Sequence, residues 1–163
     1  MKAIAEDLDT GEKITVDITE DHFEELRTLA EDKVSDSKLD SYINNLHLSA
    51  DAKQLIASIL KASVKVGDLV IRVGKRIVEL VVMLVSKFPN ATFGLILGLI
   101  VGALVAAIPL LGALLGGLVT PIATIFGLTK GYFEDLKDQN LKRKIAEATA
   151  MFQSLNGEAH VTE

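Results

Sequence analysis

The amino-acid sequence predicts a mainly α-helical membrane protein with a two-span Gly/Ala-rich hairpin, long amphipathic flanking helices and a small N-terminal β-hairpin. Three observations support this prediction. From residue 88 to residue 129 the chain runs for 42 residues without a charged side chain. Small residues recur through this run at four-residue spacing, and amphipathic patterns precede and follow it. A helix of this length would extend roughly 63 Å, about twice the thickness of a bilayer's hydrocarbon core.

Charge is unevenly distributed along the 163 residues. Residues 1–50 carry 5 basic and 13 acidic side chains, whereas residues 51–163 carry 12 basic and 9 acidic ones. Because an acidic region repels polyanions, no nucleic-acid partner is expected. The chain has no cysteine, which excludes disulfides, thiolate metal sites and a cysteine nucleophile.

These patterns divide the chain into five segments. The expected segments are an acidic soluble α/β N-terminal region (1–48), a long amphipathic helix (49–88), a transmembrane helical hairpin (89–129), a C-terminal amphipathic helix (130–157) and a mobile tail (158–163).

The first segment contains signals for strands and for helices. Ile14, Val16 and Ile18 alternate with polar residues, which is typical of a half-buried strand, and residues 3–8 could pair with it. Thr19 is a candidate N-cap for a helix over Glu20–Lys33, and a shorter helix is expected to follow it.

In the second segment, Ser49 can cap a helix that continues to Lys87. Its apolar positions follow a near-heptad spacing, and Asp68, Arg72, Lys75 and Glu79 form a charged stripe on the opposite face. The stripe is either solvated opposite a core face, or it lies at lipid headgroups on a membrane surface. Gly67 and Gly74, inside this helix, are candidates for bends or close contacts.

In the uncharged run, Pro109 is the expected turn between the two spans and the first residue of the second helix. The spans cover Ala91–Ile108 and Pro109–Leu128, and Pro121 is expected to kink the second one.

Two sets of small residues should each lie on one helix face, where they let another helix backbone approach closely. The predicted helix-packing and oligomerisation residues are Gly94, Gly98, Gly102, Ala106, Gly112 and Gly116. Packing between the two arms of one hairpin needs no partner, whereas packing between subunits would make a homo-oligomer. Both alternatives remain open, since there are two faces.

If the run lines a pore, Thr120 and Thr124 supply the polar side chains. Basic residues flank the run on both sides, and the turn between the spans is uncharged. The positive-inside rule therefore places both termini in the cytoplasm and the protein in the cytoplasmic (inner) membrane. The predicted membrane-interface basic residues are Lys87, Lys130, Lys142, Arg143 and Lys144.

No constellation typical of an enzyme is present. His22, His47 and His160 have no ligand-spaced partners, and the carboxylates of residues 1–40 lack the order of a calcium-binding loop. The prediction is therefore a protein that is not an enzyme, with no catalytic residue, metal or cofactor.

The arrangement of a helical frame around an uncharged hairpin resembles that of pore-forming colicins. The likeness implies a hairpin that enters a membrane from a soluble bundle, and no residues carry over. The leading hypothesis is an oligomer that forms a pore or perturbs the lipid bilayer from the cytoplasmic side. A second is a non-conducting membrane anchor or adaptor that recruits a soluble protein partner through residues 1–50. The third is a bundle that buries the hairpin in its own core.

Overall fold

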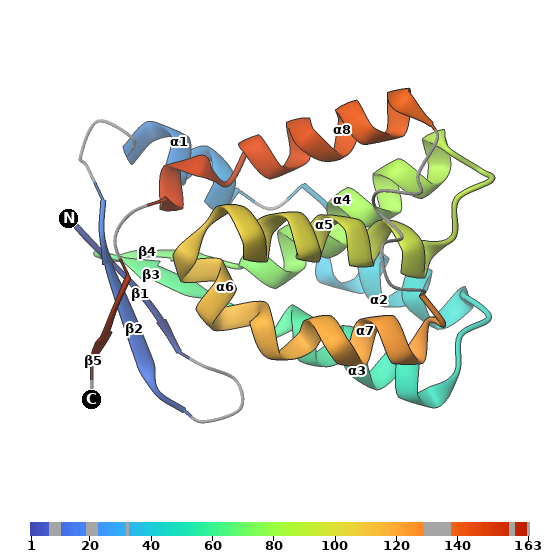
Figure 1. Ribbon diagram of the computed structural model, residues 1–163, viewed down its shortest axis with the longest axis horizontal. Coiled ribbons are helices and arrows are strands. Elements are labelled where there is room, and N and C mark those ends of the chain that lie inside the picture. The colour runs from blue at the N-terminus through green and yellow to red at the C-terminus, as the bar shows by residue number, and fades with distance from the viewer. Residues whose placement is uncertain (7–10, 19–22, 32, 129–137, 157–158, 163) are drawn as a thin grey trace.

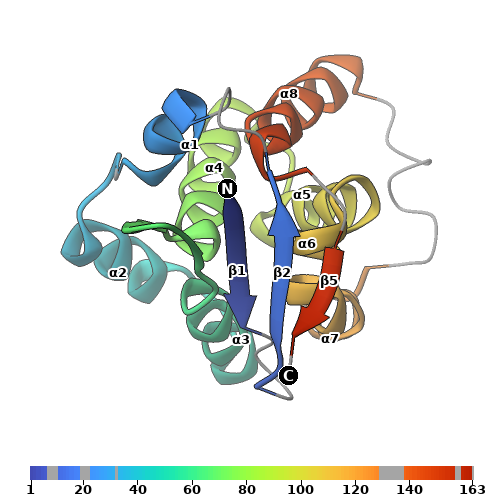
Figure 2. The same cartoon turned by 90° about the vertical axis from the view of Figure 1, so that its left-hand side faces the viewer.

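The computed structural model describes residues 1–6, 11–18, 23–31, 33–128, 138–156 and 159–162, and it forms a helical layer against one antiparallel sheet. Figure 2 shows the sheet in front with the helices behind it. The strand order is β4-β3-β1-β2-β5. The strands are β1 (Lys2–Glu6), β2 (Lys13–Asp17), β3 (Val64–Val66), β4 (Leu69–Ile71) and β5 (Ala159–Thr162).

The predicted pairing of the two N-terminal strands is confirmed. β1 and β2 pair antiparallel from Lys2 opposite Asp17 to Glu6 opposite Lys13. Alternate residues of the two strands, Ala3 and Ala5 in β1 and Ile14 and Val16 in β2, are buried, as the period of two requires. The opposite face is exposed and carries charged residues together with Ile4.

Behind the sheet, the helices surround one apolar member, α5 (Figure 1). It contacts α4, α6, α7 and α8, while α6 also reaches β1 and β2. The helices are α1 (Phe23–Ala30), α2 (Asp36–Asn45), α3 (Ala50–Leu60), α4 (Val73–Lys87), α5 (Phe93–Ala107), α6 (Pro109–Leu115), α7 (Val119–Ile125) and α8 (Gln139–Ala150), with the 3₁₀ turns η2 (Gly116–Leu118) and η3 (Gln153–Leu155).

Serine caps begin two of the helices. The Ser49 hydroxyl accepts from the Ala52 N–H at 3.1 Å, which confirms the predicted cap of α3. The Ser35 hydroxyl does the same for α2 by accepting from the Lys38 N–H at 3.3 Å. The predicted Thr19 cap lies outside the described residues, and α1 covers only the middle of the helix expected over Glu20–Lys33.

The prediction of one long helix over 49–88 is wrong. The chain leaves α3, makes the short hairpin β3–β4, and only then begins α4. Gly67 sits at the hairpin turn with φ +60°, a conformation that a residue with a Cβ adopts at a cost. β3 pairs with β1, so the hairpin is held in the sheet.

The predicted transmembrane hairpin is also wrong. Across the described residues, no helix combines the length and the apolar character that crossing a bilayer requires. α5 has 15 residues, which is roughly 22 Å, against a hydrocarbon core of about 30 Å. The fold class and the transmembrane and pore-forming assignments are corrected accordingly.

Prolines and glycines interrupt the second half of the uncharged run. Pro109 is the first residue of α6, as predicted. The expected kink at Pro121 is replaced by a break at η2, and the proline lies in the first turn of α7, where its missing N–H has no intrahelical partner to lose. The two segments of the predicted second span, α6 and α7, have 7 residues each.

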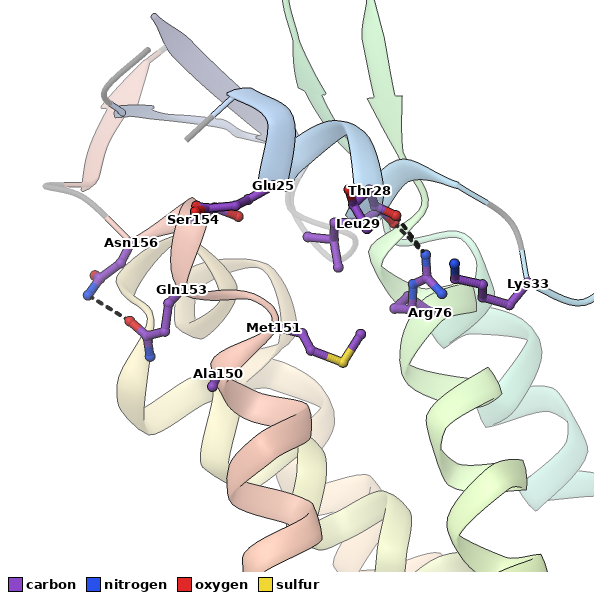
Figure 3. A pocket seen from close by; sticks show the side chains of 10 residues that line it. All are labelled: Glu25, Thr28, Leu29, Lys33, Arg76, Ala150, Met151, Gln153, Ser154 and Asn156. Carbon is purple, nitrogen blue, oxygen red and sulfur yellow. Dashed lines mark hydrogen bonds between the residues drawn. The ribbon is translucent and has the colours of Figure 1, made fainter. Parts of the chain in front are cut away.

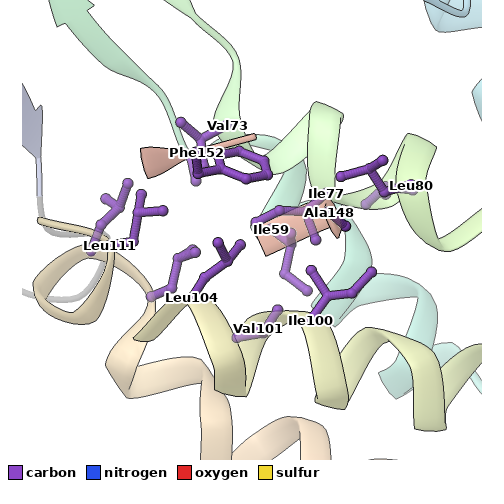
Figure 4. Close-up of a cluster of buried hydrophobic side chains, with 14 of the residues drawn as sticks. Ile59, Val73, Ile77, Leu80, Ile100, Val101, Leu104, Leu111, Ala148 and Phe152 are labelled. Atoms are coloured by element: carbon purple, nitrogen blue, oxygen red, sulfur yellow. The ribbon is translucent and has the colours of Figure 1, made fainter. Parts of the chain in front are cut away.

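The apolar run instead supplies the core of the fold. α5 is apolar on all sides because it is surrounded by other helices, which is the environment that such a helix needs. Figure 4 shows its side chains meeting those of neighbouring helices in one cluster. Fully or nearly buried members of this cluster include Ile59, Val73, Ile77, Leu80, Ile100, Val101, Leu104, Leu111, Ala148 and Phe152.

The C-terminal region differs from its prediction at both ends. α8 covers Gln139–Ala150 of the helix expected over 130–157, and residues 130–137 lie outside the described part. The tail predicted to be mobile over 158–163 contains β5, whose residues Ala159–Thr162 pair antiparallel with β2.

Candidate ligand pocket

A cavity of about 740 Å³ lies between α1, the first turns of α4, and the end of α8 with η3 (Figure 3). This volume is within the range that binds small molecules. Three distant parts of the chain contribute to its wall. The lining residues are Glu25, Thr28, Leu29, Lys33, Arg76, Ala150, Met151, Gln153, Ser154 and Asn156.

Arg76 of α4 forms one wall and holds α1 in place. Its Nη2 donates to the carbonyl oxygens of Thr28 at 3.1 Å and Leu29 at 3.0 Å, and to that of Glu31. The last carbonyls of a helix have no partner inside the helix. Arg76, from the neighbouring helix α4, therefore donates hydrogen bonds to carbonyl groups at the C-terminal end of α1.

The charge of Arg76 is paired within the same helix. Glu79 Oε1 lies 3.6 Å from Arg76 Nη1, and the two side chains are only 6% and 4% exposed. Glu79 Oε2 also accepts from the backbone N–H groups of Lys33 at 3.2 Å and Val34 at 2.9 Å. A buried ion pair is tolerated when further hydrogen bonds satisfy its atoms, and this pair has them on both sides.

A second ion-pair cluster fixes the start of α2 beside the pocket. Asp36 lies 2.8 Å from Lys75 Nζ and 2.9 Å from Arg72 Nη1. Hydrogen bonds from Lys75 and then Arg72 lower the pKa of Asp36 below its usual value. The Lys75 side chain is 2% exposed, so this contact gives a buried ammonium its counter-charge.

Two residues that line the pocket each contain a buried polar atom without a hydrogen-bond partner among the described residues. They are Arg76 Nε and Ser154 Oγ, and both are buried. Ser154 belongs to η3, which contacts α1. Phe152 and Leu155, which lie on either side of Ser154 in the chain, are both buried. A buried donor without a partner costs about 1–3 kcal/mol, so both atoms lower the stability of this region.

Charge and apolar surface alternate around the cavity. Figure 3 shows Glu25 beside Ser154 at one end, and Arg76 with Lys33 at the other. Met151 and Leu29 lie between these ends. Lys33 Nζ lies 3.8 Å from Glu31 Oε2 in an exposed pair at the rim.

Sequence reasoning missed this pocket because it treated the charges of α4 as a solvated or headgroup-facing stripe. In the structure Lys75 and Glu79 are buried, and both meet the segment around α1 and α2. The signal was present: three ionisable residues stand among consecutive apolar ones between Val73 and Leu80. Such charges in an apolar helix indicate buried partners.

The first predicted small-residue face packs inside the chain at Gly94. A Cβ on this residue would lie 2.3 Å from Phe126 Cδ1, so the glycine lets α5 meet the end of α7. The rings of Phe93 and Phe126 lie 6.4 Å apart at the same place. Gly98 is buried in α5, Gly102 is partly buried, and Ala106 is exposed.

The second face is less uniform. A Cβ on Gly112 would lie 2.9 Å from the carbonyl oxygen of Val105, whereas one on Gly116 would meet no heavy atom of the described residues within 4 Å. Thr120 and Thr124 are exposed on α7. Packing of either face between subunits stays a prediction.

The predicted membrane-interface residues are spread over two helices. Lys87 ends α4 and borders a smaller hollow of about 350 Å³ that Asp138 and Leu141 also line. Lys142, Arg143 and Lys144 lie on α8, where Lys144 Nζ pairs with Glu147 at 3.2 Å, and Lys130 lies outside the described residues.

No group of three or more His, Cys, Asp or Glu side chains able to hold a metal occurs in the part of the chain that the structure describes. In comparisons with known proteins, no family model, no curated protein and no solved structure matches this chain.

Proposed function

We propose that this protein is a binding module for a small molecule, which it holds in the pocket between α1, α4 and η3. The observation that carries the proposal is a cavity of about 740 Å³ whose wall combines the fixed side chain of Arg76 with the apolar side chains of Leu29 and Met151. A concave site with a few polar groups placed among apolar ones is the usual form of a ligand site.

The residues around the cavity are arranged to bind a ligand. Arg76 is fixed by three carbonyl oxygens and by Glu79, so its guanidinium is held in place before any ligand arrives. Such preorganisation reduces the entropy lost on binding. Met151 can adapt to different apolar groups because its side chain is long and unbranched.

A fragment screen followed by ¹H–¹⁵N NMR tests the proposal. Bound fragments should shift the signals of Leu29, Arg76 and Met151 together. Ala150→Trp, which places an indole at the cavity, should abolish these shifts, while Ala57→Trp on an exposed position of α3 should leave them unchanged. Fragments that bind only elsewhere, or equally to Ala150→Trp, would overturn the proposal.

Several earlier expectations are independent of this pocket. A soluble partner at residues 1–50, a homo-oligomer, contact with a lipid bilayer, an inner-membrane location and the lack of enzymatic activity all stay predictions. Residues 23–40 do expose acidic side chains, among them Glu24 and Asp40, at the surface where such a partner would bind.

A further inference from the structure

The outer face of the sheet, on the side away from the helices, is exposed (Figure 2). The strand registers place Lys65 of β3 opposite both Val70 of β4 and Ile4 of β1, and they place Ile4 opposite Thr15 of β2. Residues paired across neighbouring strands point to the same face. These four residues therefore form one row across the outer face.

Two large apolar side chains in this row are exposed. Ile4 is 41% exposed and Val70 is 46% exposed, and Lys65 lies between them in the row. Both border one hollow of about 650 Å³, which is lined by Ile4, Glu6, Gly11, Lys13, Lys61, Ser63, Lys65 and Val70. Single exposed apolar side chains are common on protein surfaces, whereas two that share a concave site indicate a binding surface.

The described side chains that line the hollow have an excess of positive charge. Three of them are lysines and one is a glutamate, which gives a net charge of +2. Glu6 lies opposite Lys13 in the strand register, so these two charges compensate each other. The excess comes from Lys61 and Lys65, which are both exposed. Because a surface binds best to one of complementary charge, the hollow favours an acidic partner.

The same features favour another protein over a second copy or a membrane. Two outer faces related by a twofold axis would bring the excess lysines of one copy against those of the other. A bilayer surface has no protruding side chain that could enter the hollow. The outer face also carries the carboxylates of Glu6 and Asp17, whereas anionic lipid attracts clusters of basic residues.

Independently of the small-molecule pocket, we propose that the outer face of the sheet docks an acidic segment of another protein. Carboxylates of the segment lie against Lys61 and Lys65, and an apolar side chain of the segment enters the hollow between Ile4 and Val70. Ile4 and Val70 are two strands apart, which is about 10 Å. The methylene stem of Lys65 is apolar, so the space between them suits an aliphatic side chain.

Three ten-residue peptides with blocked ends test the chemistry of the partner. The first is Glu-Glu-Leu-Leu-Glu-Glu-Leu-Leu-Glu-Glu, the second has Lys in place of Glu, and the third has Ser in place of Leu. When the first peptide is extended, each of its faces presents acidic and apolar side chains in turn. In ¹H–¹⁵N spectra it should shift the signals of Ile4, Lys65 and Val70, and leave those of Leu29 and Met151 unchanged. It should bind about fivefold or more tightly than either of the other two peptides.

Charge reversal on the protein tests the role of the two lysines. Lys61→Glu combined with Lys65→Glu should lower the affinity for the Glu–Leu peptide about tenfold or more, because two attractive contacts become repulsive. Both positions are exposed, so the variant should fold like the wild type. Lys38→Glu combined with Lys87→Glu makes the same change in net charge at exposed positions of α2 and α4. This control should leave the affinity within about twofold of the wild type.

Ile4→Thr combined with Val70→Thr tests the apolar contact. Threonine keeps a β-branched side chain in each strand, so the sheet should be retained. The affinity for the Glu–Leu peptide should fall about three- to tenfold, because apolar area is lost from the hollow.

Several results would overturn the proposal. Equally tight binding of the Lys–Leu peptide, or an unchanged affinity in the Lys61→Glu, Lys65→Glu protein, would refute the charge complementarity. Equally tight binding of the Glu–Ser peptide would refute the apolar contact. No shift at Ile4 and Val70 with millimolar Glu–Leu peptide would refute the docking site itself.

Two measurements identify the other occupants of this face. Sedimentation with phosphatidylcholine vesicles that contain about one fifth phosphatidylserine, if it is lost in the Lys61→Glu, Lys65→Glu protein, would assign the face to lipid. Self-association in analytical ultracentrifugation that the same variant abolishes would assign it to a second copy. Either result would overturn the proposed protein partner, and neither is expected. The fragment-binding pocket is unaffected by all of these outcomes, because its lining shares no residue with the hollow.

Discussion

Gly74→Ala should destabilise the protein strongly, because no room exists for a methyl group at the crossing of α3 and α4. A Cβ built on Gly74 would lie 1.6 Å from the carbonyl oxygen of Ile59 and 2.6 Å from its carbonyl carbon. Carbon and oxygen in contact stay about 3.3 Å apart, so the two backbones would have to separate by roughly 1.7 Å. This separation would also strain the hydrogen bond from the Gly74 N–H to the Ala62 carbonyl, which is 3.0 Å long.

The size of the loss in the free energy of unfolding depends on which atoms have to move. Overpacking a well-packed site commonly costs 1–3 kcal/mol, and the obstacle here is backbone rather than a flexible side chain. We expect a loss of about 3 kcal/mol or more in the free energy of unfolding, measured by urea denaturation followed by circular dichroism. The slope of the transition should stay the same while its midpoint falls.

Gly116→Ala is the matched control for this substitution. Gly116 has φ −55° and ψ −37°, and a Cβ there would meet no heavy atom of the described residues within 4 Å. Alanine at such a position should raise stability by about 0.4–1 kcal/mol through the unfolded state. A Gly74→Ala protein that unfolds within about 0.5 kcal/mol of the wild type would refute the predicted close packing of α3 on α4.

Three further predictions concern other parts of the fold. Gly94→Leu should destabilise the protein by about 1–3 kcal/mol, because its side chain would overlap Phe126, and adding Phe126→Ala should recover part of the loss in the same urea assay. Hydrogen bonds from Lys75 and a neighbouring arginine lower the pKa of Asp36 in the folded protein. Its contribution to stability is therefore present above its unfolded pKa of about 3.9 and is lost as pH falls through the lower folded value. Asp36→Asn should reduce the acid sensitivity of the unfolding midpoint below about pH 4. Glu79→Ala should cost about 3–5 kcal/mol, because it leaves a buried guanidinium without its counter-charge, and hydrogen exchange should quicken in the segment that joins α1 to α2.

Each of these predictions has a result that counts against it. No recovery in the Gly94→Leu, Phe126→Ala double variant would show that the two residues do not meet. Asp36→Asn should differ from Asp40→Asn, an exposed change on the same helix, and equal acid sensitivity of the two would remove the assigned role of Asp36. Glu79→Ala with the stability of Glu24→Ala, an exposed substitution on α1, would contradict the buried pair.

Local signals predicted the elements whose form depends on neighbouring residues in the chain. The alternation in β2, the Ser49 cap and Pro109 at the start of α6 are set by backbone chemistry within a few residues, and the structure contains all of them. The hairpin β3–β4 was missed because its strands have only three residues each, which is too short for a period of two to outweigh the surrounding helical spacing.

The larger error, the predicted transmembrane hairpin, arose because the sequence does not show what surrounds the apolar run. An all-apolar helix is compatible with lipid and with a protein core, and composition does not distinguish them. Here the surroundings of α5 are α4, α6, α7 and α8, which come from different parts of the chain. The pocket was hidden for the same reason, since Arg76 and Ser154 are separated by 77 intervening residues and meet only through the fold.

The binding site can be tested most directly by isotope-filtered nuclear Overhauser measurements on the complex with a fragment found in the screen. We expect contacts from the fragment's protons to the Met151 methyl group and the Leu29 methyl groups, and their loss in Ala150→Trp. Contacts to methyl groups of other regions only, or contacts to Met151 and Leu29 that persist unchanged in Ala150→Trp, would contradict it.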